Sequence, residues 1–420
     1  MDALYKQSIR LEHDDYPMEL MECSLEYVEC QAERYIFMVG GPLLVALSII
    51  GNSITFSVML REKLRHTATA VFIASLAVMD TMATITGLSR HFILKTFGVD
   101  VRNLSATSCS VHRFFLYISL DTSSWLLGLI AIERFIAVCK PQHYKRLRTA
   151  SMALKVVGVL VLLHVVFNMH VFWTRGINWI EVENVNDNSS TVELNCGYTS
   201  EESRFFWTHH QGWMVLVWYC IIPFTTMLVL DIFIIQRLYK LQRTSLNRTS
   251  ISRTHSGVSE TGLAKHTNSM TRMLLTVTLY FLIITTPVFI FTMCQSLLFY
   301  NDPTDGRTLG KEEEEKLARM ELIDASLTIL LYLNHSINFC LYLLTGRRFR
   351  RELSTMLNCS CNRIASTRRL STKQSIKETQ ANGTNTNAYV QVASATPMLP
   401  RSFNDTNHST CTSRINISAL

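Results

Sequence analysis

The sequence predicts an all-α membrane protein, a seven-transmembrane helix bundle with a short amphipathic eighth helix. Three observations support this. Seven apolar stretches are long enough to cross a bilayer, for which about 20 residues suffice. The connections between them alternate in charge. The third stretch has Cys109 at one end and Arg134 at the other, and these 25 residues make roughly 37 Å of helix, enough to cross the membrane at a tilt.

The spans and their flanking segments follow from composition, which is 48% hydrophobic. The first 34 residues are polar and acidic, unlike a cleaved signal peptide, so the first span is expected to act as its own insertion signal. We expect an extracellular tail over 1–34, a bundle over 35–345, an amphipathic helix over 346–357 and a disordered cytoplasmic tail over 358–420. The predicted spans are residues 35–60, 69–94, 108–139, 152–174, 212–237, 272–300 and 322–345.

Charge sets the predicted orientation. Alternate connections are rich in Lys and Arg, and such connections stay in the cytoplasm, which places the N-terminus outside. The outer segments then hold 23 of the 33 acidic residues and 11 of the 40 basic ones. The overall charge of +7 therefore gives no reason to expect nucleic-acid binding. The acidic outer loops either attract a cationic ligand or are simply solvated surface.

Four cysteines fall on the outer side, where disulfides persist. We expect Cys109 to pair with Cys196, whereas the sequence leaves open whether Cys23 pairs with Cys30 and closes a small N-terminal loop. Further predicted modifications are glycosylation at Asn103 and Asn188, palmitoylation at Cys359 and Cys361 below the membrane, and phosphorylation at Ser371 after two arginines. Unmodified cysteines are the alternative at 359 and 361.

Polar residues at mid-depth of the spans are costly and need a reason. They are Asn52, Asp80, Ser123, Asn334 and Asn338. They predict either a sodium ion or ordered water held at Asp80, or hydrogen bonds that only join the helices. No other cofactor is expected. Pro223 and Pro287, inside the fifth and sixth spans, predict kinks.

A ligand site is predicted where basic, acidic and aromatic residues converge in the outer thirds of the spans. Its candidates are Arg90, His91, Arg113, Tyr117, Asp121, Trp213, Gln295 and Asp324. The arginines suit a peptide carbonyl or carboxylate, and the aspartates suit a ligand arginine. The alternative is that Arg90 pairs with Asp324, or Arg113 with Asp121, and that no ligand touches them.

Together these positions resemble the rhodopsin-like (class A) G-protein-coupled receptors over about residues 35–357. The matching motifs are Gly51-Asn52, Ser75-Leu76-Ala77-Val78-Met79-Asp80, Cys109 with Cys196, Glu133-Arg134-Phe135, Pro141, Pro223, Phe281, Pro287, Asn338-Phe339-Cys340-Leu341-Tyr342 and Phe349. Within the family, Phe167 to Trp173 and Asn334 to Phe339 resemble the invertebrate neuropeptide receptors of the FMRFamide-receptor-like group.

The chain departs from the family pattern at several positions. The fourth span lacks its usual Trp, Thr285 stands in place of a Trp, and Phe339 stands in place of a Pro. Asp231 replaces a Tyr of the fifth helix. His335 lies beside Asn334, and if it faces Asp80 it competes with sodium for that carboxylate.

The resemblance implies a plasma-membrane receptor for a peptide, not an enzyme, that acts by population shift. Glu133 would hold Arg134 at rest. Activation would move the sixth helix outward and turn Arg134, with Phe135, Asn338 and Tyr342, toward a heterotrimeric G protein. Receptor kinases and arrestin would act on the inner Ser and Thr clusters. Alternatives are a non-peptide ligand, a weakly coupled receptor, or a seven-span transporter or channel, for which no repeats or ion path are evident.

Overall fold

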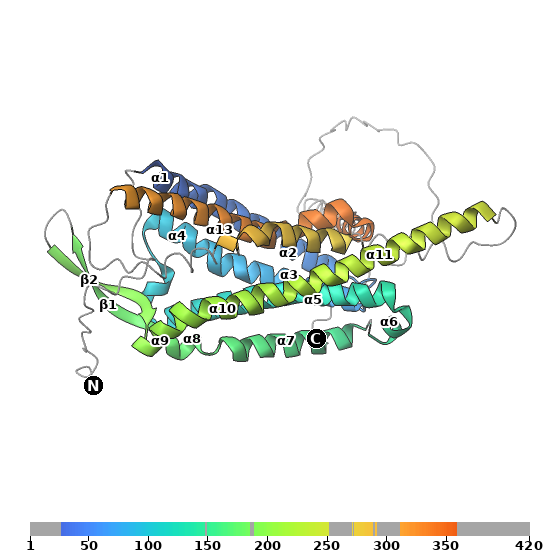
Figure 1. The fold of residues 1–420 in the computed structure, drawn as a ribbon, viewed down its shortest axis with the longest axis horizontal. Helices are drawn as coiled ribbons and strands as arrows, with labels where there is room; N and C mark the ends of the chain where they lie inside the picture. The colour runs from blue at the N-terminus through green and yellow to red at the C-terminus, as the bar shows by residue number, and fades with distance from the viewer. Residues whose placement is uncertain are drawn as a thin grey trace, which may run out of the picture. The chain divides into compact units, whose positions relative to one another are not determined.

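The structure of the protein is a computed structural model, which describes residues 27–147, 149–184, 189–251, 271, 273–288, 290–291 and 311–358. The chain divides into two compact units, Met1–Arg347 with the helix bundle and Arg348–Leu420, and each is considered by itself. Figure 1 shows the helices of the bundle running side by side, with one strand pair, β1 and β2, at the end of the bundle where α1 lies.

The first half of the bundle contains three spans and their connections. In chain order its elements are α1 (Val28–Tyr35), the π-helical turn η2 (Ile36–Gly40), α2 (Gly41–Met59), α3 (Ala68–Ala83), the π-helical turn η3 (Thr84–Leu88), α4 (Ser89–Phe97), the 3₁₀ turn η4 (Val101–Leu104), α5 (Ala106–Cys139) and α6 (Pro141–Leu147).

The second half begins with the fourth span. Its elements are α7 (Ala150–Asn168), α8 (Val171–Thr174), β1 (Arg175–Asn184), β2 (Ser189–Tyr198), α9 (Glu201–Phe206), the π-helical turn η5 (Trp207–Gln211), α10 (Gly212–Val215), the π-helical turn η6 (Leu216–Ile221), α11 (Ile222–Ile251), an apolar helix Met273–Val288 and α13 (Lys311–Thr345). A last helix covers 347–358, close to the predicted 346–357, and all of it after residue 347 lies in the second unit.

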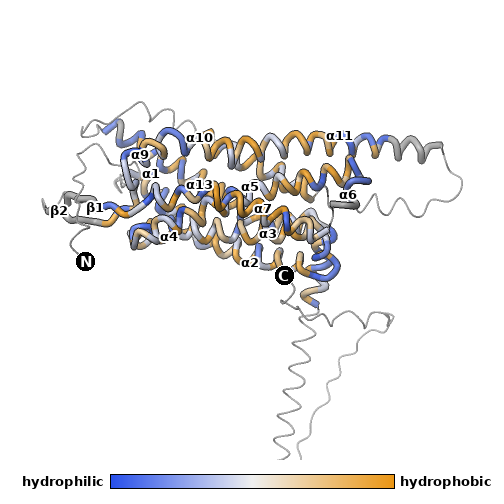
Figure 2. Tube along the Cα trace, turned by 90° about the horizontal axis from the view of Figure 1, so that it is seen from below, coloured by the Kyte–Doolittle hydropathy of each residue, from blue (hydrophilic) through white to orange (hydrophobic). Residues whose placement is uncertain are grey.

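Six helical segments of the described chain are long and apolar enough to cross a membrane, and Met273–Val288 covers the described part of the predicted sixth span. The seven-helix prediction is therefore confirmed, and the protein is a multi-pass membrane protein. Hydrophobic residues run along the middle of the helices, while hydrophilic ones gather toward the ends and connections (Figure 2). This is the pattern that a bilayer requires of helices that cross it.

Several helices extend beyond the predicted spans. The first begins at Val28 rather than at residue 35, and the seventh begins at Lys311 rather than at 322. Hydropathy marks only the part of a helix that lies in hydrocarbon, whereas backbone hydrogen bonding continues past it. Glu33 is buried in the added first turns and pairs with Lys95 at 2.7 Å, which gives this polar extension a partner.

Local capping explains where some helices begin and end. Thr67 accepts a hydrogen bond from the backbone N–H of Ala70 and starts α3, and Ser105 accepts one from Ser108 and starts α5. Ser200 does the same for α9. Such hydroxyl caps satisfy N–H groups that lack helical partners. Gly98 ends α4 in a left-handed conformation, with φ of 68°, that glycine adopts at little cost.

Helix α5 lies at the centre of the bundle and packs against α3, α7 and α11, while α13 packs against α1 and α2. Its inward side chains include Leu126, Leu127 and Ile130, all of them buried. Helix α7, by contrast, exposes Val159, Leu162, Leu163 and Val166, as expected of a helix that faces lipid.

Pro223 lies at the start of α11, directly after the π-helical turn η6, where the sequence predicts a kink. Proline has no N–H, so the carbonyl four residues earlier, that of Tyr219, loses its helical donor. Ser124 of α5 donates to that carbonyl at 2.7 Å, and the indole N–H of Trp125 donates to the neighbouring carbonyl of Trp218 at 2.9 Å. Side chains of α5 thus compensate the break in the fifth span. Pro287 lies within Met273–Val288.

Candidate functional site

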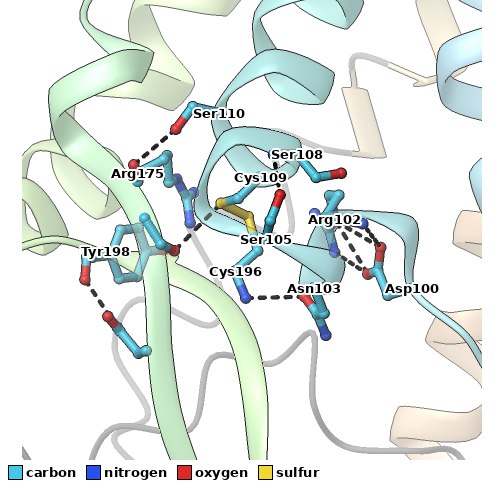
Figure 3. Close-up of a disulfide and its surroundings, with 12 residues drawn as sticks. Asp100, Arg102, Asn103, Ser105, Ser108, Cys109, Ser110, Arg175, Cys196 and Tyr198 are labelled. Carbon is cyan, nitrogen blue, oxygen red and sulfur yellow. Dashed lines mark hydrogen bonds and ion pairs between the residues drawn. A yellow bond between two sulfur atoms is a disulfide. The ribbon is translucent and has the colours of Figure 1, made fainter. Parts of the chain in front are cut away.

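The outer end of α5 is tied to the hairpin that follows the fourth span. Cys109 on α5 forms the predicted disulfide with Cys196 on β2. Strands β1 and β2 pair antiparallel, with Arg175 opposite Tyr198 and Ile177 opposite Cys196. Figure 3 shows the disulfide beside Asn103, whose side-chain oxygen accepts a hydrogen bond from the backbone N–H of Cys196 at 3.0 Å. The hairpin is thereby fixed against the bundle, although its strands were not predicted from the sequence.

An ion cluster lies next to this disulfide. Asp100 accepts hydrogen bonds from Arg90 at 2.7 Å and from Arg102 at 2.8 Å, and its carboxylate is largely buried between them. The structure therefore pairs Arg90 with Asp100, and the expected alternative of Arg90 with Asp324 is wrong. Burial alone would raise the pKa of Asp100, but the hydrogen bonds and charges of the two arginines hold it well below its usual range.

An arginine held between aromatic rings forms the second outer feature. The Arg175 guanidinium lies 4.1 Å from the ring centre of Tyr198 and 4.0 Å from that of Trp207. Tyr117 in turn stacks on Trp207, with ring centres 5.9 Å apart. Stacking of a guanidinium on aromatic faces is favourable. Of these four residues the sequence analysis named only Tyr117. Arg175, Tyr198 and Trp207 lie in separate segments, and they come together only when the hairpin folds against the bundle.

The other predicted ligand residues have mixed outcomes. His91 stacks on Phe37 with ring centres 4.8 Å apart, and Arg113 is buried. Asp121 accepts a hydrogen bond from Asn168 at 2.8 Å, a partner that the sequence analysis did not name. Trp213 is 54% exposed and so does not line the bundle interior with the others. Asp324 is partly buried.

Mid-depth polar residues of three helices meet at Asp80, whose side chain is 1% exposed. Its Oδ1 accepts hydrogen bonds from Ser123 at 2.5 Å and from His335 Nδ1 at 2.8 Å. Its Oδ2 accepts one from Asn338 at 2.7 Å. Asn52 donates to the His335 carbonyl at 3.2 Å. Asn334 is buried, but among the described residues no hydrogen bond joins it to Asp80.

At the cytoplasmic end of α5, Glu133 and Arg134 form a buried ion pair with an N–O distance of 2.7 Å. Glu133 also accepts from Thr69 of α3 at 2.8 Å and from Tyr144 of α6 at 3.0 Å, and Arg134 contacts the same Thr69 hydroxyl. Burial and the adjacent carboxylate of Glu133 raise the pKa of Tyr144, so its phenol stays protonated and can donate. Phe135 meets Phe233 of α11, with ring centres 6.2 Å apart.

Two further activation candidates lie on α13. The side chain of Asn338 belongs to the Asp80 network, and Tyr342 is buried one turn later. Six residues with predicted roles at a site or modification lie outside the described residues, and their roles stay predictions. These are the Cys23 partner of Cys30, Asn188, Gln295, Cys359, Cys361 and Ser371; Cys30 itself is disulfide-bonded.

Comparison with known proteins agrees with this arrangement. A family model described as 7 transmembrane receptor (rhodopsin family) matches residues 51–342. Cholecystokinin receptor type A of Homo sapiens is 33% identical over 119 residues, which cover 28% of this chain and 27% of that receptor. Olfactory receptor 51T1 of Homo sapiens is 30% identical over 118 residues, which cover 28% of this chain and 35% of that protein. The match thus spans about a quarter to a third of these relatives.

Proposed function

This chain belongs to the rhodopsin family of seven-transmembrane receptors, which are not enzymes, and we propose that it is a plasma-membrane receptor transmitting the binding of an extracellular peptide to heterotrimeric G proteins. The observation that carries the proposal is the arrangement along α5. One end is bonded to the hairpin through Cys109, and the other holds the buried pair of Glu133 and Arg134. A single rigid helix thus joins the two ends of the bundle.

The orientation of the proposed receptor has its N-terminus outside the cell. The alternating basic connections support this topology, because positively charged loops remain in the cytoplasm. The disulfide agrees with it, since disulfides persist on the extracellular side. In this orientation Asn103 and Asn188 are accessible to glycosylation, and Cys359 and Cys361 to palmitoylation at the inner leaflet.

The ligand site is proposed at the outer end, where Arg90, His91, Arg113 and Tyr117 lie near the hairpin. A peptide suits such a site because it offers both charged groups and apolar side chains to basic and aromatic residues. One relative is named as a receptor for cholecystokinin, and this lends support to a peptide ligand. The acidic outer segments favour a peptide with positive charge.

Signalling is proposed to be a shift between two conformers. At rest Arg134 is held by Glu133 and Thr69. Ligand binding favours a conformer in which the helix Met273–Val288 moves outward and Arg134 turns to the G protein. Kinases then phosphorylate inner Ser and Thr residues, Ser371 among them, and the added charge recruits arrestin.

The test is a calcium assay in cells that express the receptor with a promiscuous G protein, read against a library of neuropeptides. Arg134→Ala is measured beside the wild type, with surface expression as the control. A peptide response that disappears in a well-surfaced Arg134→Ala variant is the expected result. A peptide response that Arg134→Ala leaves unchanged would overturn the proposed role of Arg134.

A second candidate is a class A receptor for a non-peptide ligand. The match to an olfactory receptor favours it, because that protein is similar to this chain to nearly the same extent. Silence across the peptide library with a response to small molecules would support this candidate. High agonist-free signalling, or none with any ligand, would indicate a weakly coupled receptor.

A further inference from the structure

The carboxylate of Asp80 already has a protein donor on each of its oxygens. Ser123 Oγ and His335 Nδ1 reach Oδ1 at 2.5 and 2.8 Å, and Asn338 Nδ2 reaches Oδ2 at 2.7 Å. An ionised carboxylate only accepts hydrogen bonds, so the imidazole nitrogen facing it must be the N–H donor. The direct contacts of this carboxylate are therefore donors, which repel a cation.

The donors arrive from two helices and the carboxylate belongs to a third, which fixes their relative positions. Asp80 belongs to α3, Ser123 to α5, and His335 and Asn338 to α13. His335 is itself held from a fourth helix, because Asn52 on α2 donates to its carbonyl at 3.2 Å and to Ser48 at 3.1 Å. His335 is only 1% exposed. At this burial, a turn of the imidazole requires the side chains packed around it to move.

A buried carboxylate needs a compensating partner. A hard cation would fill this need with oxygen ligands. Around Asp80 the oxygen ligands are scarce: the amide of Asn338 presents its nitrogen, and the ring of His335 presents Nδ1. His335 places a ring N–H 2.8 Å from Oδ1, at a position that an oxygen-bound cation would have to occupy.

We propose that the His335 imidazole takes the place of a metal cation at Asp80, so that this bundle excludes sodium from a site that its Asp80 and Ser123 would otherwise build. The residues present do not fit a sodium ion while His335 is in place. The sodium ion, which is one of the alternatives that the sequence leaves open at Asp80, is therefore replaced by a side chain that is part of α13. A serine at 335 would remove both the N–H and the ring, and would leave room for an ion or water among Asp80, Ser123 and Asn338.

The test uses thermal unfolding of the purified full-length protein, which does not depend on a ligand or on G-protein coupling. Unfolding is followed in sodium chloride and in N-methylglucamine chloride at equal ionic strength. We expect the same Tm in both salts for the wild type. His335→Ser should gain a saturable rise in Tm of a few degrees with sodium, because an ion that binds only the folded state stabilises it. The double variant Asp80→Asn/His335→Ser should lose this rise.

A sodium-dependent rise in the wild type as large as that of His335→Ser would overturn the proposal, as would a rise that survives in the double variant. If His335→Ser does not fold, the wild-type comparison still decides, together with His335→Asn, which keeps an N–H donor near the position of Nδ1 and should remain insensitive to sodium. Failure of the signalling assay above leaves these outcomes unaffected.

Discussion

Asp231 of α11 accepts a 2.6 Å hydrogen bond from the hydroxyl of Thr278 on the helix Met273–Val288. Both side chains are buried, and Asp231 stands where the family pattern has a tyrosine. The hydroxyl also lies within hydrogen-bonding distance of carbonyls of its own helix, at 3.1 and 3.2 Å. This contact joins the fifth span to the helix that is proposed to move outward on activation. It therefore stabilises the conformer in which these two helices are packed together.

Loss of this contact should favour the activated conformer. In Thr278→Val the buried Asp231 carboxylate loses its donor, which costs about 1–3 kcal/mol in the packed conformer. Because 1.4 kcal/mol is about a tenfold change in an equilibrium, agonist-free signalling should rise several-fold. Thr286→Val is the matched control, since the Thr286 hydroxyl bonds only to Leu282 of its own helix in the described structure. An equal rise in both variants would argue against the contact.

The buried pair of Glu133 and Arg134 predicts graded effects at the cytoplasmic end. Glu133→Gln removes the charge that holds Arg134, and agonist-free signalling should increase. Tyr144→Phe removes one donor to Glu133 but leaves the ion pair intact, so its increase should be smaller. Tyr239→Phe serves as the control because Tyr239 is on the surface of α11. The order of the two variants, measured per receptor at the cell surface, is the observation that checks this prediction.

Gly51 is close to α13, and a larger residue there should destabilise the bundle. A Cβ at position 51 would lie 2.9 Å from the Cβ of Phe339, and neither atom can move without its backbone. Gly51→Ala should therefore cost about 1–3 kcal/mol and lower Tm in detergent by several degrees. A Cβ at Gly158 on α7 meets nothing within 4 Å, so Gly158→Ala should be neutral or slightly stabilising. An unchanged Tm in Gly51→Ala would contradict the close approach.

The depressed pKa of Asp100 predicts how stability depends on pH. Its stabilising effect is complete above the usual range of an Asp carboxyl, about pH 4, and is lost as pH falls toward the lower pKa of the folded state. Asp100→Asn should therefore lower Tm by a constant amount between about pH 5 and 8, and the difference from wild type should shrink below about pH 4. Glu201→Gln, in an exposed pair with Arg204, should change little. A difference that grows on acidification would refute the assignment.

The hydrogen bond from Ser124 to the Tyr219 carbonyl should depend on Pro223. Ser124→Ala leaves that buried carbonyl without its donor from α5 and should lower Tm. In the Pro223→Ala background an N–H is restored to the fifth span, so the same substitution should cost less. A double-mutant cycle on the thermal stability of the four proteins measures the coupling. Additive effects would mean that Ser124 does not compensate for the proline.

Much of the architecture could be predicted because the bilayer makes hydropathy and charge decisive over long windows. This explains why the spans and the Cys109–Cys196 disulfide could be predicted. It also explains the meeting of Asp80, Ser123 and Asn338, because a polar side chain at mid-depth of the membrane costs free energy unless it has a polar partner. The strand pair of the hairpin, with 10 residues in each strand, was not predicted, and its position is fixed by contacts with Asn103 and α5. Trp213 was chosen for its depth in the span, but depth does not say which side of a helix faces lipid.

The sequence by itself determined that this chain crosses a membrane as a helix bundle of the rhodopsin family. Composition and motif order along single helices carry that information locally. Only the tertiary structure decided that Arg90 forms an ion pair with Asp100, that Thr278 donates a hydrogen bond to Asp231 and that His335 faces Asp80. The pairs Asp231–Thr278 and His335–Asp80 join residues of different helices, so their formation depends on the rotation and packing of whole helices. Asp100 lies 10 residues after Arg90 and meets it through the turn that follows α4. The packing of helices brings a polar group within hydrogen-bonding distance of its partner, and a local stretch of sequence does not contain the information that sets this packing.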